Sequence, residues 1–470
     1  MTDTTAAMPQ GVAVVIDRGT RELSDGRLLG GSPRRMLRLS DSGRAAWSGI
    51  RQGRVESASA GVLARRLTDA GMAHPRPAAA AADVTIVVPV RDRVGQLDRC
   101  LASIDAGDRV VVVDDGSADP TAVAAVVRLH GARLVRRDES GGPAAARNDG
   151  LCDIDLRQID TELIAFVDSD CRVPVRWLDR LAGHFADPAV AAVAPRVVSG
   201  RRDGSSRYRD RFGLLDAGPY EARVQPLGVV SFVPTAALVV RRSALAEIGS
   251  FDADLRYGED VDLVWRLDAA GWRVRYDPSV EVAHDEPIDW PSRLAKRFRY
   301  GTASAPLAAR HPGASAHLVA GAWPLASVAT VVARKPTFAV LATAGTYAST
   351  RRALRQADVD ELSATRLTVE ALARTWQGAG RYATQFALPL LVAAAMPRRN
   401  RVARVATLAA LALAAPLAEQ QRRPEVRRSH LVAGRLADDV AYGAGVYAGC
   451  IKQRNASPLK VVVRRRGSER

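Results

Sequence analysis

The sequence predicts an α/β protein: a parallel-sheet domain preceded by a small winged-helix-like α+β domain and followed by a helical, partly apolar C-terminal region. Three observations predict this. Short apolar runs alternate with helical patterns between residues 83 and 290, which is typical of βαβ units. A ribbon-like segment with two capped helical patterns precedes them, and uncharged segments of moderate length follow.

Length and composition fit several folded domains. The 470 residues, 47% of them hydrophobic, suffice for two or three domains of ~100 to 200 residues. The first ten residues lack the charged and apolar regions of a secretory signal, so we expect the chain to start in the cytoplasm. A reducing compartment agrees with four cysteines that show no CxxC spacing, namely Cys100, Cys152, Cys171 and Cys450.

Positive charge is concentrated at the end of the chain. The net charge is +16, but from Pro291 onward there are 29 Lys and Arg against 9 Asp and Glu, so the first 290 residues carry −4. A basic excess confined to one end indicates an anionic partner, either nucleic acid or lipid headgroups.

Residues 1–78 read as a small domain of their own. Asp25-Gly26 is a hairpin turn between two apolar ribbons. Ser40 and Ser57 have the character of N-caps for two short helices. Pro75 to Ala82 is rich in proline and alanine and is expected to be a linker.

The next domain begins with two strands, Asp83–Pro89 and Arg109–Val113, separated by a helix near Leu97 to Ile104. The second strand runs into Asp114-Asp115-Gly116-Ser117. Because open α/β sheets bind ligands at the carboxyl ends of their strands, these acids are candidate ligand contacts.

A second pair of acids follows the apolar run Leu163–Val167. Alternation along an extended segment puts Asp168 and Asp170 on one side and Ser169 on the other. Two such carboxylates suit a hard divalent cation that carries phosphate oxygens, Mg²⁺ or Mn²⁺. The alternative is a polar turn that only closes the strand.

Two further motifs have the chemistry of a phosphate site. A glycine-rich loop, Gly141-Gly142, runs into a helix that contains Ala146-Arg147-Asn148. Glu259 and Asp260 stand at the amino end of another helical pattern, where ordinary capping is the alternative explanation.

In this order and at these separations, the motifs between residues 83 and 290 resemble those of glycosyltransferase family 2. The resemblance implies a GT-A fold over residues 83–300, a nucleotide-diphosphosugar donor and inversion at the anomeric carbon. No QxxRW motif follows Glu259-Asp260, so long-chain polymerisation is not expected. The expected product is a short oligosaccharide.

The resemblance also implies roles for individual residues. Asp260 would take the proton of the acceptor hydroxyl, with Glu259 as the alternative base. His284 corresponds to a late position near the metal, although an isolated histidine is more often a structural hydrogen-bonding group. The implied metal ligands are Asp170, Asp168 and His284, and the implied nucleotide-sugar contacts are Pro89, Asp114, Asp115, Arg147 and Asp168.

The order of domains resembles one branch of the family, which adds glucose to a peptide-derived redox cofactor. This branch implies UDP-glucose as donor, and residues 1–78 are similar in outline to PqqD-like peptide-recognition domains. A lipid or cell-envelope acceptor is the alternative. A haloacid-dehalogenase phosphatase is disfavoured, because it leaves Asp114 and Asp115 unexplained.

Residues 301–470 are expected to form a basic, helical, membrane-associated region. Four uncharged segments contain 17, 14, 16 and 14 residues, short of the ~20 that a spanning helix needs: His317–Ala333, Thr337–Thr350, Tyr382–Pro397 and Val405–Ala418. Pro324, Pro389 and Pro416 interrupt three of them, so hairpins or interfacial helices are expected.

We therefore expect the cytoplasmic face of the cell membrane as the location, either peripheral or hairpin-inserted. Arg398-Arg399-Asn400-Arg401 would face anionic headgroups. A soluble helical subdomain in the cytoplasm is the alternative. Nucleic-acid binding through Arg464-Arg465-Arg466 by a non-enzymatic basic adaptor is disfavoured, because no aromatic stacking or recognition-helix pattern accompanies that charge.

Overall fold

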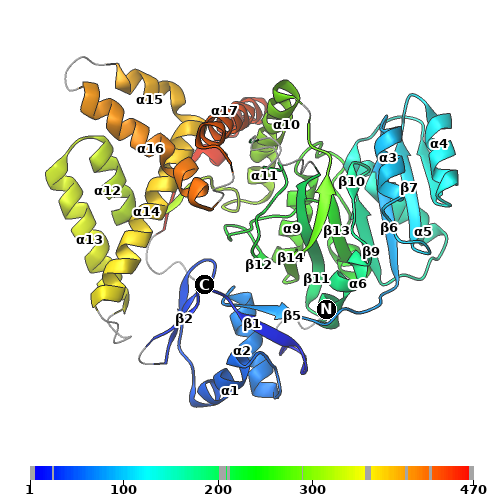
Figure 1. The fold of residues 1–470 in the computed structure, drawn as a ribbon, viewed down its shortest axis with the longest axis horizontal. Helices are drawn as coiled ribbons and strands as arrows, with labels where there is room; N and C mark the ends of the chain where they lie inside the picture. The colour runs from blue at the N-terminus through cyan, green and yellow to red at the C-terminus, as the bar shows by residue number, and fades with distance from the viewer. Residues whose placement is uncertain are drawn as a thin grey trace. The chain divides into compact units, whose positions relative to one another are not determined.

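The computed structural model describes residues 6–23, 26–200, 208, 212–287, 289–354, 361–396, 401–422 and 426–464 (Figure 1). The chain forms two compact units. The first comprises Met1–Glu22, Gly26–Arg202 and Phe212–Glu286, and the second Leu23–Asp25, Asp203–Arg211 and Pro287–Arg470. The expected turn residue Asp25 lies outside the described residues, and so do Arg398, Arg399, Asn400, Arg465 and Arg466.

The front part of the first unit is the expected strand-and-helix module. Helices α1 (Asp41–Arg51) and α2 (Ala58–Asp69) both begin as predicted: Ser40 Oγ accepts a hydrogen bond from Gly43 N at 3.1 Å, and Ser57 Oγ accepts one from Ala60 N at 3.2 Å. The strands are β1 (Ala13–Ile16) paired with β5 (Ala73–Arg76), and the small sheet of β2 (Arg21–Glu22), β3 (Leu28–Gly30) and β4 (Arg35–Leu37).

The expected linker is partly a strand and partly held in place. Pro75 belongs to β5, and farther along Ala80 N donates to the carbonyl of Asp179 at 2.9 Å. Arg65 of α2 forms two hydrogen bonds with buried Asp187, at 2.7 and 2.6 Å. Long-range contacts that a Pro- and Ala-rich composition does not reveal therefore hold the front module and part of this segment against the rest of the unit.

The core of the first unit is a nine-stranded sheet of mixed direction (Figure 1). Its main path is β10-β14-β11-β13-β9-β6-β7-β8, with β12 beside β14; β6 is parallel to β7 and β9, and β13 is antiparallel to β9. The strands are β6 (Val84–Val90), β7 (Arg109–Asp115), β8 (Arg133–Arg137), β9 (Leu163–Val167), β10 (Cys171–Arg172), β11 (Val190–Ser199), β12 (Ala222–Val224), β13 (Ala237–Arg241) and β14 (Arg273–His284).

Helices cover both faces of this sheet. Ile86 and Val88 of β6 pack with α3 (Val94–Leu101) and α4 (Pro120–Leu129) in one apolar cluster. Val87 points to the other face, where a Cβ added at Gly150 of α5 (Pro143–Leu156) would lie 2.5 Å from its side chain. Alternation along β6 thus places α5 opposite α3 and α4, and only glycine at 150 permits that approach. Helices α6 (Trp177–Ala182), α8 (Arg242–Ile248) and α9 (Glu259–Ala269) complete the unit.

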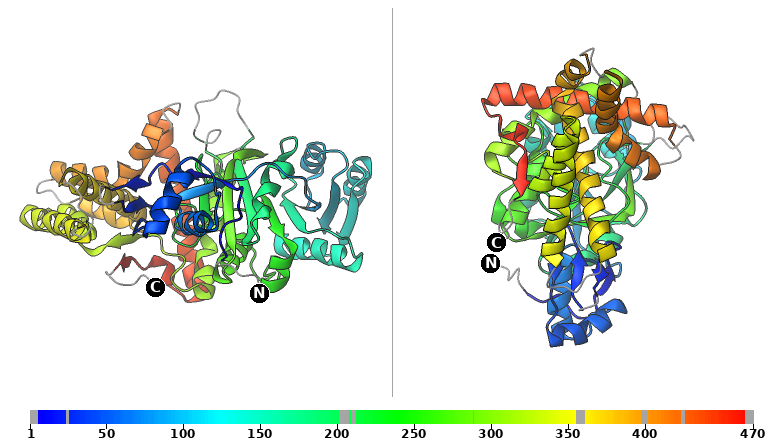
Figure 2. Two further views of the ribbon diagram at one scale, coloured as in Figure 1. Left: turned by 90° about the horizontal axis from the view of Figure 1, so that it is seen from below. Right: turned by 90° about the vertical axis from the view of Figure 1, so that its left-hand side faces the viewer.

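The second unit is helical (Figure 2). Its interior is polar as well as apolar. Arg293 of α10 bonds the buried carboxylate of Asp438 on α17, which Tyr208 also bonds at 2.8 Å. The helices are α10 (Trp290–Thr302), α11 (Ser304–Arg310), α12 (Ala322–Val332), α13 (Pro336–Leu354), α14 (Glu361–Phe386), α15 (Leu388–Ala395), α16 (Arg401–Arg422) and α17 (Arg428–Gln453), with strands β15 (Val319–Gly321) and β16 (Val462–Arg464).

The prolines do not interrupt these helices in the way the sequence predicts. Pro324 and Pro389 lie in the first turns of α12 and α15, where a missing N–H costs little, and Pro416 is accommodated inside α16. The 14 uncharged residues of Val405–Ala418 are therefore part of the longer helix α16. Within the described residues, α16 alone is long and apolar enough to cross a membrane, and 17% of that stretch is buried.

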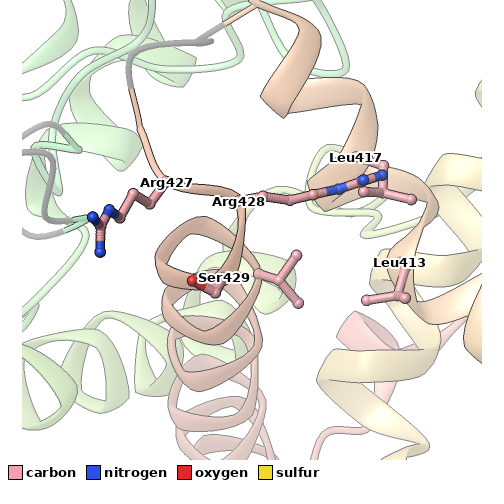
Figure 3. Close-up of a pocket in the computed structure, with 6 residues that line it drawn as sticks. Leu413, Leu417, Arg427, Arg428 and Ser429 are labelled. Atoms are coloured by element: carbon pink, nitrogen blue, oxygen red, sulfur yellow. The ribbon is translucent and has the colours of Figure 1, made fainter.

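A cavity of about 660 Å³ lies in the second unit (Figure 3). Leu413 and Leu417 of α16 and Arg428 and Ser429 of α17 line it. None of the predicted site residues lines it.

Candidate active site

The acids predicted from strand ends meet at one edge of the sheet. Because β6 is parallel to both β7 and β9, the carboxyl ends of β7 and β9 flank that of β6. Asp114 pairs in register with Val90, next to Pro89, and Asp168 directly follows β9. The topology thus brings together residues that are more than fifty positions apart.

Asp114 and Asp115 are both buried and have protein partners. Asp114 accepts a hydrogen bond from Ser117 N at 2.9 Å and forms an ion pair with Arg136. Asp115 accepts bonds from the backbone nitrogens of Gly141 and Gly142, at 2.8 and 2.9 Å. Asp115 therefore holds the glycine-rich loop in shape, and a direct contact of either acid with a nucleotide stays a prediction.

Arg147 joins the two acidic motifs. It comes from α5, its side chain is 3% exposed, and its Nη2 and Nη1 donate to Asp168 Oδ1 at 2.6 Å and Glu259 Oε1 at 2.9 Å. Burial alone would lower the pKa of Arg147, but the two carboxylates outweigh it and raise that pKa. Both terminal nitrogens are thus engaged by carboxylates, and a contact of Arg147 with the donor stays a prediction.

The neighbouring Asn148 holds the approach to α9. Its side chain accepts from Phe251 N at 3.0 Å and donates to Phe251 O at 2.8 Å. The Phe251 ring contacts Phe166 of β9 edge-on at 5.0 Å between centroids. This segment leads to Gly258, whose φ of +83° is a left-handed conformation that suits glycine and starts α9 at Glu259.

The structure gives the two acids of α9 different surroundings. Glu259 is buried and bonded to Arg147, whereas the Asp260 carboxylate accepts a hydrogen bond from the backbone nitrogen of Val261 at 2.8 Å. Burial raises the pKa of Asp260 to about 7, and the negative charge of Glu259 adds to the shift. A carboxylate with such a pKa can take a proton near neutral pH.

Asp170 lies beside His284 and Arg93. Its Oδ2 forms an ion pair with Arg93, while its Oδ1 is buried without a hydrogen-bond partner, 3.7 Å from His284 Nε2. His284 Nδ1 lies 3.1 Å from Glu286 Oε1. Since a carboxylate only accepts, His284 donates from Nδ1, and in the neutral ring Nε2 is then an acceptor facing another acceptor.

These residues fit a divalent cation. Two acceptor atoms that face each other need a positive charge between them, which either a proton on the ring or a metal ion supplies. The histidine is also oriented by a carboxylate, as metal-binding histidines commonly are. Ligands bound at ~2.1 Å to one ion lie roughly 3 to 4 Å apart, in keeping with the 3.7 Å observed. No group of three His, Cys, Asp or Glu side chains able to hold a metal occurs among the described residues, so a donor phosphate and water would have to complete the shell.

Sequence reasoning missed two members of this cluster. Arg93 ends the charged triplet Arg91-Asp92-Arg93 directly after β6, at the same sheet edge as the predicted acids. Glu286 follows His284 by two positions, a spacing that puts both on one side of an extended segment. Both signals were present, but only the fold shows what they meet.

Comparison with known proteins defines the class. The profile of the family described as "Glycosyl transferase family 2" matches residues 85–249, which include Asp114, Arg147 and Asp170. The chain belongs to this family, and its fold is GT-A.

The narrower resemblance is confirmed as well. The chain is 39% identical over 483 aligned positions to the pre-mycofactocin glycosyltransferase of Mycobacterium tuberculosis, covering 98% of this chain and 100% of that protein. Glycosyltransferase AglE of Haloferax volcanii is 26% identical over 232 positions, 46% of this chain and 71% of that protein. A mannosyltransferase structure from Pyrobaculum calidifontis, in complex with GDP-Man and Mn²⁺, matches 77% of this chain and 90% of that one at 20% identity and a TM-score of 0.42.

Proposed function

We propose that this enzyme transfers glucose from UDP-glucose, with inversion, onto the peptide-derived redox cofactor of mycofactocin biosynthesis and builds a short oligosaccharide there. The acceptor is supported by end-to-end similarity to the pre-mycofactocin glycosyltransferase of M. tuberculosis. The observation that carries the chemistry is the Arg147 bridge, which links Asp168 and Glu259 across the sheet edge.

Direct displacement assigns the proton to Asp260. The acceptor oxygen forms a bond to the anomeric carbon as the bond from that carbon to the donor's phosphate oxygen breaks, and the acceptor's proton passes to the Asp260 carboxylate. The raised pKa supports Asp260 as the base. Glu259 is held by Arg147 and serves to position that guanidinium.

Asp170 and His284 are the proposed metal ligands. Asp168, at the end of β9, is the third candidate ligand. Their support is the facing acceptor pair and the Glu286 carboxylate behind the histidine. When bound, Mg²⁺ or Mn²⁺ would neutralise charge on the departing nucleoside diphosphate. Pro89, Asp114 and Asp115 form the proposed edge of the nucleotide site.

Residues 1–78 are proposed to hold the peptide-derived acceptor. Their support is similarity in outline to peptide-recognition domains together with the firm docking of α2 through Arg65 and Asp187. A docked module keeps its ligand at high effective concentration near the catalytic edge.

The proposed location is the cytoplasmic face of the cell membrane. Support comes from the basic C-terminal region and from large apolar side chains that remain exposed on its helices, among them Phe338, Leu341, Leu390 and Val402.

A transfer assay tests the proposed function. Purified protein is incubated with Mn²⁺, the peptide-derived cofactor and either UDP-glucose or GDP-mannose, and products are read by mass spectrometry. We expect hexose addition from UDP-glucose, loss of addition in chelator, and at least a hundredfold loss in Asp170→Asn. Undiminished activity of that variant in chelator would contradict the metal role, and transfer only to lipid acceptors would contradict the proposed substrate.

A further inference from the structure

Arg93 reaches the metal-site candidates from the turn that follows a neighbouring strand. It stands in the turn between β6 and α3, and its guanidinium forms an ion pair with Asp170 Oδ2. The two partners differ in exposure: the Arg93 side chain is 50% exposed and that of Asp170 is 7% exposed. The buried acid is thus fixed, whereas the arginine can turn toward solvent.

The backbone beneath Arg93 is held firmly. Asp92 has a left-handed φ of +54°, its nitrogen donates to Ser117 Oγ at 2.9 Å, and its Oδ1 accepts from Ala118 N at 2.7 Å. Any change in the partner of Arg93 therefore falls to its side chain, with the turn unchanged.

The two oxygens of Asp170 face opposite demands. Oδ1 is the buried acceptor that faces His284, and Oδ2 is neutralised by Arg93. A divalent cation between Oδ1 and His284 would bind the same carboxylate as the Arg93 guanidinium. Two positive charges on one carboxylate repel each other. Metal and Arg93 then compete for Asp170.

We propose that Arg93 is a positioning residue that neutralises Asp170 before the donor arrives and moves onto the donor's diphosphate when the metal binds. The inference rests on the proposed function, since it needs a nucleoside diphosphate and a divalent cation at this edge. A planar guanidinium suits this exchange, because it pairs equally well with carboxylate and with phosphate oxygens.

The exchange makes two opposite predictions for one variant. Without nucleotide, Arg93→Gln should bind Mn²⁺ about tenfold more tightly than wild type does, because a repelling positive charge is removed. The expected change is only about tenfold because Arg93 is half-exposed and solvent weakens its effect. With saturating Mn²⁺, the same variant should bind UDP about tenfold more weakly, because a charge-assisted hydrogen bond to phosphate is lost.

Free Mn²⁺ measured by electron paramagnetic resonance and UDP binding measured by calorimetry test this without any turnover. Arg109→Gln is the matched control. It removes an exposed arginine at the beginning of β7, which pairs with Asp83, and it should leave both affinities unchanged. Arg93→Lys should lie between wild type and Arg93→Gln.

Unchanged or weaker Mn²⁺ binding by folded Arg93→Gln would overturn the exchange, and so would unchanged UDP binding. Asp170→Asn separates the two proposals. If wild type and Asp170→Asn bind Mn²⁺ equally, or wild type binds none even with UDP, the proposed metal site itself fails and the exchange fails with it. If Asp170→Asn alone loses Mn²⁺, the metal site stands and Arg93→Gln decides the exchange.

Discussion

At the residue scale, the decisive finding is how Arg147 divides the work of two adjacent acids. Arg147 bonds Glu259, whereas burial and the neighbouring charge of Glu259 raise the pKa of Asp260 to about 7. The two acids are adjacent in sequence, yet only one of them bonds a residue more than a hundred positions away.

Asp260→Asn should abolish transfer while sparing donor binding. An amide keeps the shape of the carboxylate but cannot take a proton, so we expect kcat to fall by ~10² to 10⁴ with the affinity for UDP-glucose unchanged. Steady-state kinetics and calorimetry measure the two. Parallel loss of donor affinity would instead indicate that Asp260 binds the donor.

The pH dependence of the same residue has a defined sign. As the proposed base, Asp260 can accept a proton only when it is ionised, so wild-type kcat should fall as pH drops below about 7. Because the folded pKa lies above the unfolded one, ionisation costs stability progressively from about pH 4 to 7 and fully above it. Asp260→Asn should therefore raise Tm at pH 8 and not at pH 4, as scanning calorimetry would show; an equal change at both values would contradict the raised pKa.

At the scale of elements, α2 anchors the front domain on the transferase. Arg65 and Asp187 are both buried, and Asp69 at the end of the same helix pairs with Arg273 of β14 at 2.7 Å. Ion pairs inside an interface restrict the relative motion of the two parts that it joins.

Arg65→Ala should loosen this docking and with it acceptor recognition. Removal of one partner leaves Asp187 buried and uncompensated, at a cost of ~3 to 5 kcal/mol. We expect faster proteolysis at residues 77–82 and lower kcat/KM for the peptide-derived acceptor, with donor hydrolysis unchanged.

The matched control is Arg66→Ala, which removes the exposed neighbour on the same helix and should change stability by less than about 0.5 kcal/mol. Should Arg65→Ala increase proteolysis yet glycosylate the acceptor at the wild-type kcat/KM, the front domain is not its recogniser.

At the scale of the whole molecule, excess positive charge and exposed apolar side chains are both concentrated after residue 290. The basic excess of 20 there coincides with exposed Leu390 (71%) and Val392 (58%) on α15. Both features favour an anionic bilayer, since cations attract the headgroups and apolar side chains enter the interface.

Flotation with vesicles that contain anionic lipid tests this. Leu390→Asp with Val392→Asp should reduce the floating fraction several-fold, because a charge on the inserted face opposes burial in the interface. Leu156→Asp is the control, an exposed leucine (79%) at the end of α5 in the transferase unit. Equal flotation of all three proteins, or none by wild type, would contradict membrane attachment.

Local patterns by themselves determined much of the fold. The strands at 84–90, 109–115 and 163–167 follow from apolar runs, the starts of α1 and α2 from Ser40 and Ser57, and the acidic sheet edge from where those runs end. Each depends on neighbours within a few positions, so sequence contains the whole cause. The motif order likewise predicted the family that comparison confirms.

Only the tertiary structure decided which acids differ and what they touch. Arg147 meets Glu259 across 112 positions, Arg93 meets Asp170 across 77, and Arg65 meets Asp187 across 122. Such pairs form because sheet topology closes long loops, and the burial and charge that raise the pKa of Asp260 exist only once those loops are closed. The sequence determined which chemical groups are present, and the fold decided which of them meet.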